Sequence, residues 1–586
     1  MNFLRNLLAS ILGSLMAFGI LFAMFMIFLA LMSNADDGVV VKKNSILEIS
    51  FTEPIRDYLG KDETDPFGGF WDDEAGLDEI IHAIRVASGD DKIEGISLTT
   101  SFVQAGLAQT QEIRKALEDF KTSGKFIYAH SDFFTQKDYY LASVADKLYL
   151  NPVGGMDFKG LSTEVLYFKD LQEKTGVKME VIRHGKYKSA VEPYLSNTMS
   201  AENREQLREL ITSLWGEMLD GISNSRGLST DQLNTIADTL GGRTPEMAVT
   251  SGLIDGKLYV DEYENLLKQN LGVEEEDDLN YVSFQDYITL SKGTRYFVGK
   301  DKVAVIYAQG EIYYGEGSKE FIGQGLITSA LQKAARSENV KAIVLRIDSP
   351  GGSALVSDII WREVELTKKE KPVVVSFGNV AASGGYYIGV GADKIYAEPT
   401  TITGSIGVFG TIPNVSELAG DIGINAEQVG TNKNSVDYSL FEPMSNSFRD
   451  VVQEGIEDTY NTFLERVAAG RKMSVEDVDA LAQGRVWSGL DAKENGLVDE
   501  LGTLEDAIAA AAEMAELDSY GIRKYPRYKS DFERFMENFG GAKAKLGEAL
   551  IQEEIGNEAY QILKEFKQFT QQKGIQAKMP FSLNIK

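Results

Sequence analysis

The chain has 586 residues, more than the roughly 250–300 at which a single core stops growing, so we expect at least two domains. Its formal charge of −29 would repel the phosphates of nucleic acids, and no basic stripe offsets it, so we expect no nucleic-acid partner. The lack of cysteine excludes thiol catalysis and Cys-ligated zinc. The chain has only three histidines and no HExxH pair, which argues against a histidine-based metal site and against a Ser-His-Asp triad. We therefore expect no metal and no cofactor.

The first element expected along the chain is a transmembrane helix. Leu7 to Met32 form an uncharged, mostly apolar run of 26 residues, long enough at about 1.5 Å per residue to cross a bilayer. The run exceeds the apolar region of a cleaved signal peptide, although Ser33-Asn34-Ala35 resembles a cleavage site. The flanking charges do not decide the orientation. Because so few residues precede the run, we expect residues 1–6 to form a cytoplasmic tail and 7–32 an uncleaved anchor.

An internal repeat indicates a duplicated domain. Residues 139–149 match residues 386–396 at an offset of 247, which is far longer than the period of a solenoid repeat. Met199-Ser200 and Met444-Ser445 then open two helices with matching apolar stripes. We therefore expect two copies of one domain.

The boundaries of the copies follow from composition. We expect the first copy at 40–272, an acidic linker at 273–300 and the second copy at 301–518. A charged tail at 519–586 follows, with a helical pattern around Glu548–Phe569.

Each copy reads as alternating strands and helices, which is typical of an α/β fold. In the second copy, short apolar runs at Val303–Tyr307, Ala342–Ile347 and Val373–Phe377 are separated by helical patterns. Continuous apolar runs of this length predict strands that are buried on both faces of a parallel sheet.

The copies differ first in a glycine loop. In the second copy the strand at 342–347 is followed by Asp348-Ser349-Pro350-Gly351-Gly352, whereas the first copy has Ser101-Phe102-Val103-Gln104-Ala105. Glycines after a strand allow a sharp turn that presents backbone N–H groups, as an oxyanion hole requires. An ordinary turn is the alternative interpretation of such a loop.

The copies differ again at a serine. Ala382-Ser383-Gly384-Gly385-Tyr386 follows the strand at 373–377, so Ser383 lies at a strand-to-helix junction where the N–H of Gly384 could stabilise an oxyanion. A helix N-cap is the simpler role for such a serine. The matching residue of the first copy is Gln136. Because one copy lacks both the serine and the glycine loop, we interpret the two features as parts of one site.

A nucleophilic serine needs a base, and lysine can serve if burial keeps its amine neutral. Lys188 lies in the semi-apolar stretch Gly185–Pro193 of the first copy, although a solvated surface charge is the ordinary role of a lysine. Lys433 aligns with Lys188 at an offset of 245 and is a rival base in the same copy as Ser383. We favour Lys188, because the Glu-Pro pair of its motif is displaced by five residues after Lys433, to Glu442-Pro443.

These motifs resemble the signal peptide peptidase A family, the long, duplicated form of the S49 serine peptidases. The resemblance covers essentially the whole chain and rests on four strings: Tyr-Lys-Ser-Ala-Val-Glu-Pro at 187–193, Asp-Ser-Pro-Gly-Gly at 348–352, Ala-Ser-Gly-Gly-Tyr at 382–386 and Thr-Gly-Ser-Ile-Gly at 403–407. It implies a tandem of ClpP/crotonase-like α/β domains behind one transmembrane helix.

The same resemblance implies the roles of individual residues. Ser383 would be the nucleophile and Lys188 the general base, supplied by the other copy. The N–H groups of Gly384 and Gly352 would form the oxyanion hole, and Ser405 would orient the lysine. The resemblance further implies a homotetramer in the bacterial inner membrane, with its catalytic domains in the periplasm, that degrades cleaved signal peptides and would accept other peptides.

Two other functions remain compatible with the sequence. A crotonase-type acyl-CoA enzyme shares the fold and the glycine-lined oxyanion hole, although it needs neither an anchor nor the Lys188 motif. A catalytically silent membrane scaffold is the second alternative, although the second copy retains every element of a site.

Overall fold

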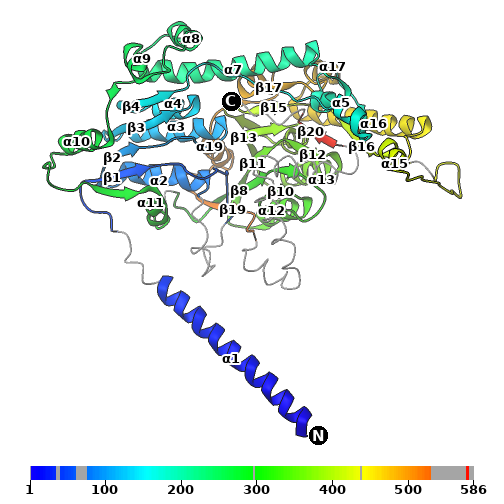
Figure 1. Ribbon diagram of the computed structural model, residues 1–586, viewed down its shortest axis with the longest axis horizontal. Helices are drawn as coiled ribbons and strands as arrows, with labels where there is room; N and C mark the ends of the chain where they lie inside the picture. The colour runs from blue at the N-terminus through cyan, green and yellow to red at the C-terminus, as the bar shows by residue number, and fades with distance from the viewer. Residues whose placement is uncertain are drawn as a thin grey trace.

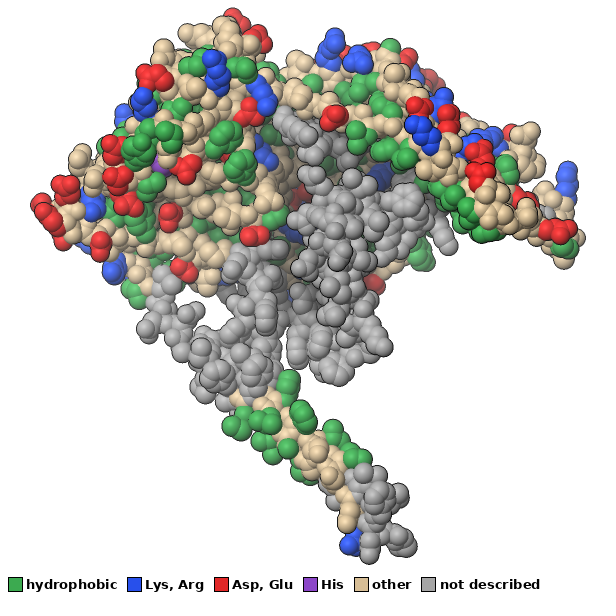
Figure 2. Space-filling model, viewed as in Figure 1, with side chains coloured by type: hydrophobic (Ala, Val, Ile, Leu, Met, Phe, Trp, Pro, Cys, Tyr) green, Lys and Arg blue, Asp and Glu red, His purple; other side chains and the backbone are tan. Residues whose placement is uncertain are grey.

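The computed structural model describes residues 2–33, 40–60, 75–294, 297–435, 438–528 and 576–579. Helix α1 (Asn2–Ser33) points away from the folded body, and hydrophobic side chains cover much of its described part (Figures 1 and 2). Among the described residues, no helix combines the length and the apolar character that crossing a membrane requires. The helical pattern expected at Glu548–Phe569 lies outside the described residues.

The first copy alternates strands and helices as the sequence predicts. Its elements are β1 (Ser45–Ile49), α2 (Leu77–Gly89), β2 (Ile93–Leu98), α3 (Leu107–Lys121), β3 (Phe126–Phe134), α4 (Gln136–Ala142), β4 (Lys147–Met156), α5 (Lys169–Thr175), β5 (Lys178–Arg183), the 3-10 turn η1 (Ser189–Val191), α6 (Glu192–Leu195), α7 (Ala201–Arg226), α8 (Thr230–Asp238), α9 (Pro245–Thr250), β6 (Gly256–Lys257), α10 (Val260–Leu271), β7 (Asn280–Ser283) and α11 (Phe284–Ser291).

The second copy repeats this alternation. Its elements are β8 (Lys302–Gln309), β9 (Glu311–Ile312), β10 (Phe321–Ile322), α12 (Gln324–Arg336), β11 (Val340–Ser349), β12 (Gly351–Ser353), α13 (Ala354–Thr367), β13 (Val373–Ala382), α14 (Gly384–Gly389), β14 (Lys394–Ala397), β15 (Ile402–Gly404), β16 (Phe409–Asn414), α15 (Ser416–Asp421), α16 (Asn446–Arg471), α17 (Val475–Leu481), β17 (Val486–Ser488), α18 (Gly489–Glu494), β18 (Glu500–Leu501), α19 (Leu504–Met514), β19 (Gly521–Tyr525) and β20 (Gln576–Lys578).

Each copy is built on its own sheet. The first copy has the order β6-β4-β3-β2-β1-β7 with parallel pairing. The second has the order β17-β15-β13-β11-β8-β19, and off this path β14 pairs with β13 and β18 pairs with β14. The three strands predicted from apolar runs are confirmed as the parallel strands β8, β11 and β13. The side chains of these strands are almost all buried, because helices cover both faces of a parallel sheet.

Equivalent hydrogen bonds confirm the duplication. Tyr139 on α4 donates its hydroxyl to the carbonyl of Leu253 at 2.9 Å, and Tyr386 on α14 donates to that of Leu497 at 2.8 Å. The two helices expected after the Met-Ser pairs are α7 and α16, each capped by the serine of its pair. Helix α7 extends from its own copy along the top of the second (Figure 1).

The expected linker and tail contain strands of these sheets. Within 273–300, β7 pairs with β1, and within 519–586, β19 pairs with β8. The acidic run Glu274–Asp278 is exposed, as a solvated joint would be. Strand β7 extends the first sheet beyond residue 272, and β19 extends the second sheet beyond residue 518. The folded part of each copy therefore continues past the boundary expected from the sequence.

A third, mixed sheet joins the copies in the order β10-β9-β12-β20-β16-β5. Strand β5 of the first copy pairs antiparallel with β16 of the second, with Arg183 opposite Phe409. This pairing carries the chain that follows β5, including the stretch around Lys188, onto the second copy.

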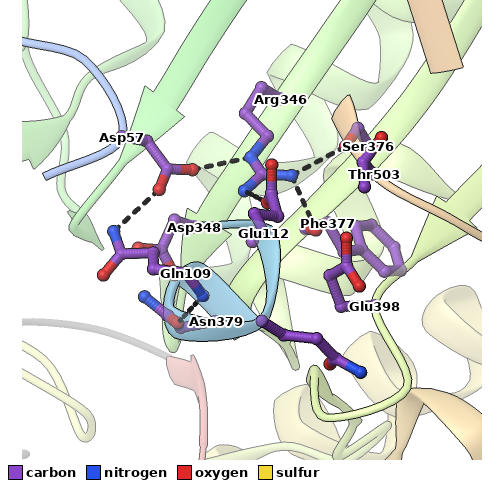
Figure 3. A network of polar contacts seen from close by, with 12 residues as sticks. Asp57, Gln109, Glu112, Arg346, Asp348, Ser376, Phe377, Asn379, Glu398 and Thr503 are labelled. Carbon is purple, nitrogen blue, oxygen red and sulfur yellow. Dashed lines mark hydrogen bonds and ion pairs between the residues drawn. The ribbon is translucent and has the colours of Figure 1, made fainter. Parts of the chain in front are cut away.

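A buried ionic network around Arg346 of β11 also links the copies (Figure 3). Its guanidinium donates to Asp57 at 2.6 Å and also pairs with Glu112, both from the first copy. The same group donates to the hydroxyl of Ser376 at 2.8 Å. Burial alone would lower the pKa of Arg346, but the two carboxylates raise it overall, so the side chain is cationic.

We expect Arg346→Met to destabilise the protein strongly, by about 3–5 kcal/mol, because it leaves two buried carboxylates without their partner. The midpoint of urea unfolding measures the effect. As a control, Lys115→Met removes the exposed pair with Asp119 and should cost only a few tenths of a kcal/mol. A change as small for Arg346 as for Lys115 would show that the network does not hold the copies together.

Candidate active site

Ser383 lies between β13 and α14 in a conformation that few serines adopt. Its φ of 56° is in the left-handed region, which costs energy for a residue with a side chain and is common at functional sites. Although Ser383 occupies the N-cap position of α14, its side chain accepts no capping hydrogen bond. Its backbone N–H donates to the carbonyl of Gly404 at 2.8 Å, which holds the turn against β15. The hydroxyl is therefore available for another role.

The structure brings Lys188 of the first copy to Ser383 of the second. The Nζ atom of Lys188 lies 2.8 Å from the Oγ atom of Ser383, and both residues are fully buried. Burial lowers the pKa of Lys188 well below its usual range, because the ammonium form loses its hydration. Burial thereby favours the neutral form of this amine, which lies next to a hydroxyl.

Ser405 supplies two further contacts to the same amine. Nζ of Lys188 lies 2.9 Å from the carbonyl oxygen of Ser405 and 3.0 Å from its hydroxyl oxygen. A neutral amine has two N–H donors and one lone pair. If both N–H groups donate to the two oxygens of Ser405, the lone pair can accept the hydroxyl proton of Ser383. Like Ser383, Ser405 has a left-handed backbone, with a φ of 50°.

The glycine loop lies beside the serine. Gly352 belongs to β12 and has a φ of 153°, and a Cβ placed on it would lie 2.2 Å from the carbonyl oxygen of Ile312. A Cβ placed on Gly384 would lie 3.2 Å from the backbone nitrogen of Gly352. The backbones of Gly384 and Gly352 therefore lie close together next to Ser383, and a side chain at either position would collide with its neighbours.

Two glycines make room for the lysine, and sequence reasoning missed one of them, Gly484. A Cβ on Gly484 would lie 2.6 Å from Cβ of Lys188, and one on Gly407 would lie 3.2 Å from its Cδ. Gly484 precedes β17 and Gly407 precedes β16. Gly407 lies in the 403–407 motif noted above. Gly484 lies in none of the motifs, because a glycine that makes room for a distant side chain has no local sequence pattern.

The loop that carries Lys188 is itself anchored by buried polar groups. Gln206 on α7 donates to the carbonyl of Tyr187 at 3.0 Å and to the hydroxyl of Ser189 at 3.1 Å. Glu192 accepts the N–H of Ser200, at the start of α7, at 2.7 Å. The Glu192-Pro193 pair that follows Lys188 therefore has a structural role, because the carboxylate of Glu192 holds the loop against the start of α7.

The rival residues lie in different surroundings. Lys433 is exposed in the loop between α15 and α16. Gln136, which matches Ser383 in the first copy, is buried and accepts the N–H groups of Lys159 at 2.7 Å and Gly160 at 2.6 Å. Its amide thus closes a loop in the first copy. In the described part of the chain, no cluster of acidic and histidine side chains is arranged to hold a metal.

Comparison with known proteins identifies the family. The model of Peptidase family S49 matches residues 119–274 and 365–518, once in each copy. The chain belongs to peptidase family S49. It is 38% identical to Protease 4 of Salmonella typhi over 81% of this chain and 78% of that protein. It is also 38% identical to Protease 4 of Haemophilus influenzae over 74% of this chain and 72% of that protein.

A plant relative extends the similarity beyond bacteria. The chloroplastic serine protease SPPA of Arabidopsis thaliana is 33% identical over 81% of this chain and 70% of that protein. This S49 protein is therefore a serine-type peptidase with duplicated α/β domains, and none of these relatives supports an acyl-CoA enzyme or a silent scaffold.

Proposed function

We propose that this S49 peptidase hydrolyses peptide bonds with a Ser383/Lys188 dyad assembled from both copies. The observation that carries the proposal is the distance of 2.8 Å between a buried amine and a buried hydroxyl. No histidine is needed, because burial lowers the pKa of Lys188 and leaves a neutral amine available as a base.

The reaction follows from this geometry. The Lys188 amine takes the proton of the Ser383 hydroxyl as Oγ attacks the carbonyl carbon of the substrate. The resulting ammonium then gives that proton to the nitrogen of the departing peptide, which leaves an acyl-enzyme ester. A water molecule, deprotonated by the same amine, hydrolyses the ester and restores both groups.

The neighbouring groups support both steps. The N–H groups of Gly384 and Gly352 are suited to stabilise the negative oxygen of the tetrahedral intermediate. Ser405 is a positioning residue, because it holds two N–H groups of the lysine and directs the remaining lone pair toward Ser383.

We propose cleaved signal peptides as the physiological substrates, with other peptides as further substrates. A protein of Enterococcus faecium whose name contains signal peptide peptidase is 35% identical over 38% of this chain and 64% of its own length. The test compares membranes of producing cells that carry the wild type or Ser383→Ala. Remnant signal peptides should accumulate in the variant, and equal amounts in both would contradict this choice of substrate.

We further propose that residues 7–32 anchor the enzyme in the bacterial inner membrane, with the catalytic domains in the periplasm as part of a homotetramer. The uncharged run of 26 residues supports the anchor. Removal of residues 1–35 should release a soluble enzyme with unchanged kcat on short peptides, because both sheets lie outside this segment. Sedimentation with membranes and a peptide assay measure the outcome. A folded but inactive truncated enzyme would give the segment a role in catalysis.

A further inference from the structure

A segment of three residues before β17 holds the surroundings of the proposed base. The carbonyl of its first residue, Gln483, accepts the N–H of Tyr187, which directly precedes the lysine, at 2.9 Å. The carbonyl of its last residue, Arg485, accepts the N–H of Ser405 at 2.6 Å. Gly484, between them, is the residue that makes room for the lysine side chain. The 483–485 segment therefore fixes the backbone on both sides of the contact between the amine and Ser405.

Gln483 has a strained backbone that its neighbours hold in place. Its φ of 54° lies in the left-handed region, which costs energy for a residue with a side chain. The N–H of Gln483 donates to the hydroxyl oxygen of Tyr460 on α16 at 3.2 Å. Its side-chain amide donates to the same oxygen at 3.3 Å and to the carboxylate of Asp479 at 2.6 Å. The hydroxyl of Tyr460 is therefore an acceptor that keeps Gln483 in this conformation.

Tyr460 is itself fixed where the two copies meet. It is 2% exposed, and its ring stacks on the imidazole of His184 with centroids 3.9 Å apart. His184 lies directly after β5, at the start of the loop that carries the lysine, and its Nδ1 atom lies 2.7 Å from the carboxylate of Glu457. Burial raises the pKa of the Tyr460 phenol, so the hydroxyl keeps its proton and donates a hydrogen bond to Asp479. The ring thus contacts the lysine loop, and the hydroxyl reaches the same loop through Gln483.

We propose that Tyr460 is a positioning residue for the base Lys188. Acting through Gln483, its hydroxyl holds the 483–485 segment against the lysine, which keeps the amine dehydrated and directed at Ser383. The inference rests on the proposed dyad, since it assigns a role to the surroundings of that dyad's base. Tyr460 maintains this geometry and transfers no proton itself.

Loss of the hydroxyl has two expected consequences for the base. Without this acceptor, the hydrogen bond of the Gln483 N–H no longer offsets the cost of the left-handed backbone, so the segment relaxes away from Lys188. Water then reaches the amine and stabilises its ammonium form, so the pKa of Lys188 rises toward that of a free lysine. At neutral pH less of the enzyme holds a neutral base, and the remaining neutral amine is less well aligned with Ser383.

Tyr460→Phe tests the proposal, because it removes only the hydroxyl and keeps the ring stacked on His184. We expect kcat on a fluorogenic peptide at neutral pH to fall by about 10- to 100-fold, the cost of a misplaced catalytic group. KM should stay unchanged, since the glycine loop is not altered. The pH midpoint, at which fluorophosphonate labelling of Ser383 reaches half its maximal rate, should rise. A variant that is merely less stable would lose active enzyme without moving this midpoint.

Tyr287→Phe is the matched control in the first copy. Tyr287 is also 2% exposed, and its hydroxyl donates to the carboxylate of Asp90 at 3.0 Å, so the same atom is lost from an equally buried tyrosine. Tyr287 lies on α11, away from the 483–485 segment, so kcat and the pH midpoint should match those of the wild type.

Two variants of Gln483 test whether the hydroxyl acts through this residue. Gln483→Gly in the Tyr460→Phe background should return the pH midpoint toward the wild-type value, because a glycine adopts the left-handed backbone without strain. Gln483→Ala removes the amide at a part-buried position and leaves the core unchanged. It should raise the midpoint by less than Tyr460→Phe does.

The outcomes separate the inference from the proposed function. A wild-type midpoint in Tyr460→Phe or in Gln483→Ala, or no rescue by Gln483→Gly, overturns the positioning role, while an inactive Lys188→Ala leaves the dyad intact. If Lys188→Ala is as active as the wild type, the dyad is overturned and the positioning role with it.

Discussion

Ser383→Ala is expected to lower kcat for peptide hydrolysis by about 10⁶-fold, the typical loss when a nucleophile of this kind is removed. The substitution deletes one hydroxyl that caps no helix, so the fold should remain intact. Steady-state kinetics on a fluorogenic peptide measure the loss, and circular dichroism checks the fold.

Gln136→Ala is the matched control in the other copy. Its amide accepts two backbone N–H groups, so the variant should lose some stability while kcat stays within a few-fold of the wild type. Activity of Ser383→Ala within a few-fold of the wild type would remove this serine from the mechanism.

Lys188→Ala should be nearly as damaging as Ser383→Ala, because the two groups act as one unit and their losses do not add. Lys188→Arg should fail as well, since a guanidinium stays protonated. Lys433→Ala should retain most activity, because Lys433 is exposed. The reverse result, an inactive Lys433→Ala and an active Lys188→Ala, would place the whole dyad in the second copy.

The dependence of the rate on pH has a definite sign. The neutral amine is the active form, and burial lowers the pKa of Lys188. The rate should therefore rise with pH through this lowered pKa and level off well before the value of about 10.4 for a free lysine. The same shift makes folding less favourable as the pH falls from about 10.4 toward the lowered pKa of Lys188, because over this range the unfolded chain binds a proton that the buried amine does not. Lys188→Met should remove this contribution.

The sequence predicted the parts of the fold that depend on local pattern. Apolar runs located β8, β11 and β13, and the Met-Ser pairs located the starts of α7 and α16. The linker and tail were less predictable, since β7 and β19 are short strands whose position depends on pairing with β1 and β8. Charge indicates which residues are solvated and does not indicate which neighbouring strand completes a sheet.

In the candidate site, too, some residues could be predicted from local pattern and others could not. Ser383 and the glycine loop stood out because the first copy lacks both, so the duplication acted as an internal comparison. The proximity of Lys188 to Ser383 depends on the pairing of β5 with β16, which joins segments more than 200 residues apart and has no local signal. The place of β20 beside Gly352 was not predicted for the same reason.

Covalent labelling of Ser383 by a fluorophosphonate as a function of pH tests the shared dyad most directly, because it reports the reactivity of the hydroxyl without a bound peptide. In the wild type and in Lys433→Ala, the labelling rate should rise with pH through the lowered pKa of Lys188, and peptide mapping should locate the adduct on Ser383. In Lys188→Met the rate should fall to background and lose this dependence. Labelling of Lys188→Met at the wild-type rate, or an adduct on another serine, would contradict the account.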